Sequence, residues 1–186
     1  MNGRAKGSVA EREIAKMLGT WWGQIEESVV FVRTPLSGGW GGPQLRAGFQ
    51  ASGDVMTTSI RFPWSVEVKR REGWVWKSLL NSRPSPVWGW WKQAEGQALE
   101  MGKEPLMFFR HNKERWHVMK RGSDVGINQW RVDQGTGRHV FAESFRVVCS
   151  DTTPSVIVKP WDLAQHELLE YGRKRLREKA GKKKRE

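Results

Sequence analysis

The chain has 186 residues, enough for one ordinary domain that buries its own apolar core. Its 32 Lys and Arg residues against 20 Asp and Glu residues give a formal charge of +12, which favours a polyanionic partner, nucleic acid first and an anionic membrane surface second. No long apolar run or signal-peptide segment is found, so we expect a soluble intracellular protein without a membrane partner. The single cysteine, Cys149, excludes an internal disulfide and a cysteine-based zinc site.

The first part of the chain predicts a helix and a strand. Residues 8–18 carry apolar side chains at helical spacing, with Ser8 as the expected N-cap. Residues 28–33 are rich in valine and predict a strand, which runs into a loop rich in Gly and Pro. Loops of that length usually bind a ligand or lack order.

The next segment predicts an antiparallel hairpin. Asp54 opens a short strand that extends to Thr58, and a turn leads into the stretch 62–74, "FPWSVEVKRREGW". Apolar and polar residues alternate from Phe62 to Lys69, which indicates a strand buried on one face only. The hairpin would bring Asp54 close to the polar face of the second strand.

The second half of the chain predicts further elements of both kinds. We expect a helix that ends at Gly102, a pair of strands, some short strands and an amphipathic helix with a basic tail. The helix corresponds to residues 87–101, and the pair of strands lies on either side of a turn at 111–114. The short strands fall within residues 124–160, and the amphipathic helix with its basic tail covers residues 161–186.

The predicted strand at 62–74 carries a candidate catalytic group. Positions two apart on a strand face the same way, so Glu67 and Lys69 can address one site, with the Val68 carbonyl nearby. Asp54, Glu67 and that carbonyl are hard oxygen ligands suited to Mg²⁺, and Lys69 could orient a nucleophile. This arrangement would hydrolyse a phosphodiester. Alternatively, Glu67 and Lys69 form a solvated ion pair and Asp54 only begins a turn.

Four short segments, "KGSVAERE", "FVRTPLSGG", "SGDV" and "SVEVK", occur in this order. Over roughly residues 3–120 the chain resembles the archaeal-type Holliday junction resolvases, including bacteriophage-encoded versions, within the PD-(D/E)xK nuclease superfamily. The resemblance implies an α/β, restriction-endonuclease-like fold with a central mixed sheet flanked by helices. It also implies a homodimer in the host cytoplasm that cuts four-way DNA junctions with Mg²⁺, for which Mn²⁺ would substitute.

The resemblance also implies roles for individual residues. The catalytic set would be Glu11, Asp54, Glu67 and Lys69, with Glu11, Asp54, Glu67 and the Val68 carbonyl on the metal. Helical periodicity alone does not decide between Glu11 and Glu13. By motif, Arg12 would be the basic neighbour of Glu11, and Arg33 and Ser37 would touch DNA or support catalysis. The basic residues beside the site extend this surface. The predicted DNA-binding set is Lys6, Arg12, Arg33, Ser37, Arg70 and Arg71.

The sequence also indicates a domain organisation and possible roles for the tryptophans. We predict a nuclease core at 1–120, a family-specific extension packed on it at 121–160, and a C-terminal helix and basic tail at 161–186. Twelve tryptophans could stack on bases or fill the core and a subunit interface, for which the candidates are Trp74, Trp76, Trp88, Trp90 and Trp91. The alternative functions are a nuclease of the same superfamily that acts on branched or duplex DNA, and a non-catalytic DNA-binding protein with this fold.

Overall fold

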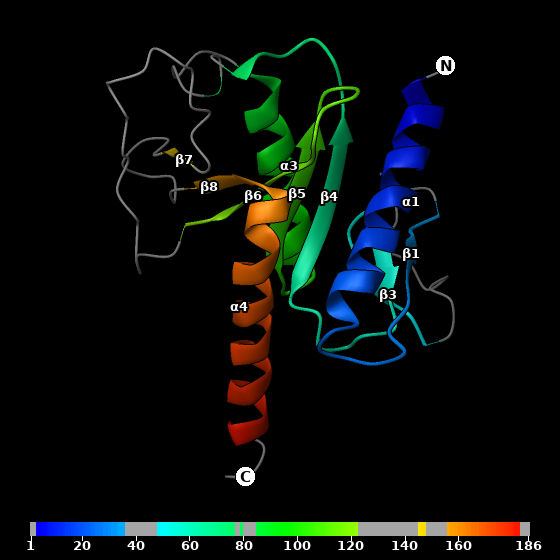
Figure 1. Ribbon diagram of the computed structural model, residues 1–186, viewed down its shortest axis with the longest axis vertical. Helices are drawn as coiled ribbons and strands as arrows, with labels where there is room; N and C mark the ends of the chain where they lie inside the picture. Colours follow the sequence, from blue (N-terminus) through cyan, green and yellow to red (C-terminus); the bar gives the residue numbers. More distant parts are fainter. Residues whose placement is uncertain are drawn as a thin grey trace.

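The computed structural model describes residues 3–35, 48–76, 79, 85–122, 145–147 and 156–182. Figure 1 shows their arrangement as helices packed on both faces of a sheet. The elements are α1 (Gly3–Trp22), β1 (Phe31–Arg33), β2 (Gln50–Ser52), β3 (Val55–Thr57), β4 (Trp64–Arg70), α3 (Pro86–Glu100), β5 (Glu104–Arg110), β6 (His117–Arg121), β7 (Phe145–Val147), β8 (Val156–Pro160) and α4 (Trp161–Lys182).

The strands form two sheets. The larger has the order β4-β5-β6-β8-β7, in which β4 and β5 are parallel and the other pairs are antiparallel. The smaller, β1-β3-β2, is antiparallel throughout. The predicted α/β class, with a central mixed sheet flanked by helices, is therefore confirmed.

The predicted hairpin between the Asp54 strand and β4 is wrong. Strand β3 pairs with β1 on one edge and with β2 on the other, so both of its edges are occupied. The sequence did not indicate the strand β2. Strand β4 pairs with β5 instead, because the helix α3 between them allows a parallel crossover. Only an isolated parallel bridge joins Gly53 to Val66. Asp54 thus reaches β4 from the residues that precede β3.

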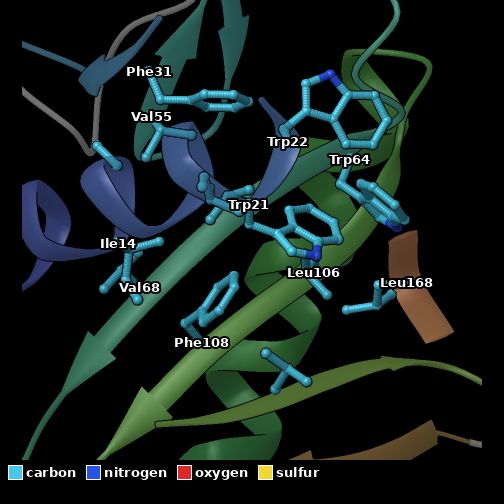
Figure 2. Packing of buried hydrophobic residues seen from close by; sticks show 14 of the residues in the cluster. Ile14, Trp21, Trp22, Phe31, Val55, Trp64, Val68, Leu106, Phe108 and Leu168 are labelled. Atoms are coloured by element: carbon cyan, nitrogen blue, oxygen red, sulfur yellow. The ribbon is translucent and has the colours of Figure 1, made fainter. Parts of the chain in front are cut away.

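Strand β4 is buried on both faces, and the expectation of a half-buried strand is wrong. Trp64, Val66 and Val68 pack with α1 and α4, as Figure 2 shows for Val68 beside Ile14 and for Trp64 beside Trp22 of α1. On the other face, the neighbouring strand β5 packs Met107 and Phe109 against α3. Because helices cover both faces, Glu67 lies in the interior at 2 % exposure rather than in solvent.

Helix boundaries differ from prediction mainly at the start of α1. The helix begins at Gly3, so Ser8 lies inside it rather than at its N-cap. Ala5 and Lys6 are good helix formers and no proline interrupts them, so the helix extends towards the N-terminus. Helix α3 ends as predicted, with Gly102 following in the left-handed region at φ +60°.

The C-terminal elements share the core of the N-terminal ones. Strand β8 pairs with β6, and Ala164, Leu168 and Leu169 of α4 are buried against the α1 cluster. Residues 156–169 thus complete the fold, although much of the predicted extension at 121–160 lies outside the described residues. None of the helices in the described ranges has the length and apolar character needed to cross a membrane.

The tryptophans fill the interior in most described positions. Trp21, Trp22 and Trp64 lie in the core beside α1 and α4, and Trp74 and Trp91 lie in the cluster beneath α3. Of the five candidates for a subunit interface, Trp74 and Trp91 are therefore used within the chain. Trp76, Trp88 and Trp90 are partly buried against the same cluster, and their role at an interface stays a prediction.

Candidate active site

Asp54 is positioned by a close backbone approach. Gly53 adopts φ +75°, and a Cβ built there would lie 2.2 Å from the Val66 oxygen. The Asp54 N–H donates to that oxygen at 2.7 Å. On the other side, the Thr34 hydroxyl donates to the backbone carbonyl oxygen of Gly53 at 2.8 Å. The Thr34 N–H donates to the backbone carbonyl oxygen of Asp54 at 2.9 Å. Only glycine fits this approach, which fixes Asp54 against β4.

The Asp54 carboxylate in turn accepts a hydrogen bond from β4. Its Oδ2 atom receives the Val68 N–H at 2.8 Å. Because the N–H and C=O of one strand residue point to the same side, the Val68 carbonyl is directed towards the Asp54 side of β4 and away from β5. The two predicted oxygen ligands Asp54 and Val68 therefore share one edge of the strand.

Glu67 and Lys69 project from the same strand and contact each other. The Lys69 Nζ atom forms an ion pair with Glu67 Oε1 and also donates to Gln93 Oε1 of α3 at 3.4 Å. The second carboxylate oxygen, Glu67 Oε2, is buried and has no hydrogen-bond partner among the described residues. A buried charged oxygen without a partner is costly unless a cation or solvent binds it.

Helix α1 contributes Glu11, and the structure separates it from Glu13. Glu11 is buried, pairs with Arg33 of β1, and acts electrostatically on both Asp54 and Glu67. Glu13 instead accepts hydrogen bonds from Arg110 Nη2 at 2.6 Å and from the indole of Trp116 at 2.8 Å. The choice that helical periodicity left open thus has a geometric answer: Glu11 faces the candidate site.

The carboxylates of this site perturb one another. Burial, and then the charge of Glu67, raise the pKa of Asp54 to about 7, and Glu11 adds to this, while the Val68 N–H opposes it. Burial likewise raises the pKa of Glu67, against the nearby Lys69. Several carboxylates buried close together repel one another when they are ionised. A divalent cation bound between them would reduce this repulsion.

These carboxylates are not arranged as a closed set of ligands. Within the described ranges, no group of three or more His, Cys, Asp and Glu side chains is placed to hold a metal ion. Arg33 and Lys69 hold Glu11 and Glu67 as ion pairs, so these two cations compete with a metal for the same oxygens. Ligation by Glu11, Asp54, Glu67 and Val68 therefore stays a prediction.

Five of the six predicted DNA-binding residues lie in the described part of the chain, on or directly after the elements that carry the site. Lys6 and Arg12 are on α1, Arg33 is on β1, and Arg70 and Arg71 are at the end of β4. Arg70 donates to Asn112 Oδ1 at 2.9 Å, while Arg12 and Arg71 are exposed. Ser37 lies outside the described residues. Contact of this set with DNA is not tested by the structure and stays a prediction.

The sequence interpretation missed two residues that hold the site together. Gly53 and Thr34 fix the backbone of Asp54, yet we assigned neither of them a role. The available signals were the glycine directly before the aspartate and a threonine among the residues of a strand end. Neither signal specifies a contact between segments that lie about 20 residues apart in the chain.

Comparison with known proteins now identifies the kind of molecule. Residues 2–157 match the family described as "Phage putative PDDEXK endonuclease". The chain belongs to this family. The PD-(D/E)xK superfamily and an endonuclease activity are thereby supported, whereas the comparison does not distinguish a junction resolvase from other members. No curated protein and no solved structure matched.

A pair of substitutions on α1 separates catalysis from stability. We expect Glu11→Gln to lower the single-turnover cleavage rate about 10²-fold, because it removes a charge that acts on Asp54 and Glu67. Glu13→Gln should leave that rate within about twofold and lower stability by about 1 kcal/mol, because it weakens the contact with Arg110. The opposite pattern of rates would move the catalytic carboxylate to Glu13.

Proposed function

We propose that this phage-family endonuclease is a Mg²⁺-dependent, structure-selective endodeoxyribonuclease that resolves four-way DNA junctions by paired symmetric nicks. The observation that carries the proposal is the meeting of Asp54 and Glu67, both buried, with Lys69 at one edge of β4. Mere DNA binding gives no reason to bury carboxylates where a phosphate must approach, since like charges repel.

The residues present fit a divalent cation. Glu67 Oε2 is buried without a partner among the described residues, and Asp54 and the Val68 carbonyl face the same side of β4. All are hard oxygen donors of the kind that Mg²⁺ binds, and Mn²⁺ accepts the same donors. When bound there, such an ion would activate water and neutralise charge on the scissile phosphate.

Side chains of the protein would orient the nucleophile and bind the phosphates. Lys69 is held between Glu67 and Gln93, so its ammonium is fixed beside the carboxylates. From that place it can orient a water molecule or stabilise charge that develops on the phosphate. Arg33 and Arg70 lie at the margins of the site and can bind neighbouring phosphates, which places the scissile bond.

Selectivity for junctions and a dimeric state follow from the motifs, the net charge and the symmetry of the substrate. The chain resembles junction resolvases in its motifs, and its charge of +12 suits a partner with several phosphate backbones. No element in the described ranges was identified as a reader of base sequence, so DNA shape would dominate recognition. A two-fold homodimer would place two such sites on opposing strands of a junction.

The test compares DNA structures of equal length. Purified protein is given a four-way junction, a flap and a linear duplex, each with Mg²⁺ and with a chelator. The proposal predicts paired nicks in the junction, little cutting of the duplex, and none with the chelator, from a protein of twice the 21.4 kDa chain mass by light scattering. Equal cutting of duplex and junction would instead favour a general nuclease of the superfamily.

A further inference from the structure

The C-terminal half of α4 lies at the opposite end of the central sheet from the candidate active site. Tyr171 of α4 donates a hydrogen bond to Glu104, the first residue of β5, and its ring lies 5.8 Å from that of Trp64, the first residue of β4. Arg175 also reaches Glu104, at 3.6 Å. Lys69 is five residues further along β4, which corresponds to about 16 Å.

From this contact the helix leads away from the active site. Figure 1 shows α4 continuing past the starts of β4 and β5 to the C-terminus, while the arrowheads of these strands point to the other end of the molecule. The eight residue-to-residue steps from Lys174 to Lys182 add about 12 Å at the rise of an α-helix. The end of α4 is therefore more than about 20 Å from Lys69.

The sequence of this helix changes from apolar to basic at Gly172. A Cβ at Gly172 would lie 2.6 Å from the ring of Trp22, so the helix packs tightly against α1 up to this point. Beyond it, basic residues dominate: Arg173, Lys174, Arg175, Arg177, Lys179 and Lys182. Lys174 and Arg177 are exposed and have no ion pair within the described part of the chain. Three residues apart, they occupy the same side of the helix.

We propose that the Lys174–Arg177 side of α4 is a second phosphate-binding surface, which contacts a segment of DNA other than the one being cut. Its unpaired positive charge matches a phosphate backbone, and its distance of about 16 Å or more from Lys69 prevents both from contacting neighbouring phosphates of one strand. This inference extends the proposed function: branched DNA offers a second duplex arm at such a distance, whereas a short linear duplex does not. In this account, α4 contributes to the preference for branched substrates.

The experiment measures binding in the presence of a chelator, so that no cleavage is required. Lys174→Glu/Arg177→Glu should weaken binding to a four-way junction at least tenfold at 0.1 M salt. The slope of log affinity against log salt should become shallower by about 1.8, since two phosphate contacts are lost. Binding to a 4-base-pair hairpin, whose stem spans about 14 Å and is shorter than the separation of the two surfaces, should change less than twofold.

Matched variants separate a local contact from a change in total charge. Lys16→Glu/Arg61→Glu alters the same net charge at exposed positions on α1 and in the loop before β4, and should have a smaller effect on junction binding. Lys174→Gln/Arg177→Gln tests the contact without charge reversal, and should still weaken junction binding severalfold. The proposal is overturned if junction affinity is unchanged, if the control pair is equally damaging, or if binding to the short hairpin is weakened as much as binding to the junction.

The result is independent of the resolvase assignment. If α4 binds a second arm but the protein makes no paired nicks, the second surface stands and the resolvase assignment fails. If paired nicks occur while both α4 variants bind junctions normally, the resolvase assignment stands and the second DNA-binding surface on α4 is refuted.

Discussion

Replacement of Asp54 by Asn should abolish cleavage and at the same time stabilise the metal-free protein. Asn keeps an oxygen that can accept the Val68 N–H, so the local structure is retained. It removes the charge that would bind a divalent ion, and we expect the cleavage rate to fall about 10³-fold or more. Junction binding should persist, and a loss of repulsion towards phosphate could only strengthen it.

The gain in stability follows from the raised pKa of Asp54. In the folded protein this pKa is about 7 against 3.8 in the unfolded chain. The native state therefore favours the protonated acid, and this contribution to stability is complete below pH 3.8 and is lost as the pH rises through 7. A shift of that size corresponds to about 4 kcal/mol. Because Glu67 can take up the same proton, we expect Asp54→Asn to recover about half of it at pH 8.

Thermal unfolding without divalent ions measures this effect. Asp54→Asn should raise the melting temperature at pH 8 by roughly 5 °C. The difference from the wild type should shrink as the pH falls below 7 and be nearly absent at pH 4. A variant that is less stable than the wild type at pH 8 would show that the Asp54 charge is compensated in the fold, contrary to the crowding of carboxylates described above.

Gly53→Ala should damage both stability and cleavage. The new Cβ would lie 2.2 Å from the backbone of Val66. The residue would also keep φ +75°, which residues other than glycine rarely adopt. Backbone strain of about 1–2 kcal/mol and overpacking of about 1–3 kcal/mol both oppose the fold. We expect about 3 kcal/mol of lost stability, roughly 10 °C in melting temperature, and displacement of Asp54 from Val68.

Gly73→Ala is the matched control for this substitution. Gly73 has φ +82° but no atom within 4 Å of a built Cβ, so its replacement adds strain without a clash. It should cost only about 1 kcal/mol and leave the cleavage rate within about twofold. Equal losses in the two variants would show that the left-handed conformation alone matters, and that the close approach of Gly53 to β4 does not position the site.

The sequence predicted well those parts that depend on short-range patterns. The helix at 87–101 and the strands around residues 111–114 follow from periodicity and turn residues, and the structure confirms them. The partner of β4 could not be found in this way. Alternation of apolar residues indicates a strand but says nothing about which strand lies beside it, and the short β2 that occupies the edge of β3 has no strong pattern.

In the candidate site, too, features set by local spacing were predictable and features set by contacts between distant segments were not. Glu67 and Lys69 share one side of β4 because positions two apart always do, and this much was predictable from spacing. The contacts of Asp54 with Val66 and Val68 depend on the pairing of distant segments, and so does the placement of Glu11 rather than Glu13. The burial of Glu67 also escaped prediction, because it arises from helices that cover both faces of the sheet.

We infer that Asp54, Glu67 and Lys69 form a metal-dependent nuclease site. It is tested most directly by the single-turnover cleavage rate of a labelled four-way junction with Mg²⁺, for the wild type, Glu67→Gln, Lys69→Ala and the control Glu13→Gln. We predict that the first two variants lose about 10³-fold in rate while retaining junction binding, and that the control cuts at nearly the wild-type rate. Cleavage at the wild-type rate by Glu67→Gln or Lys69→Ala would contradict this account.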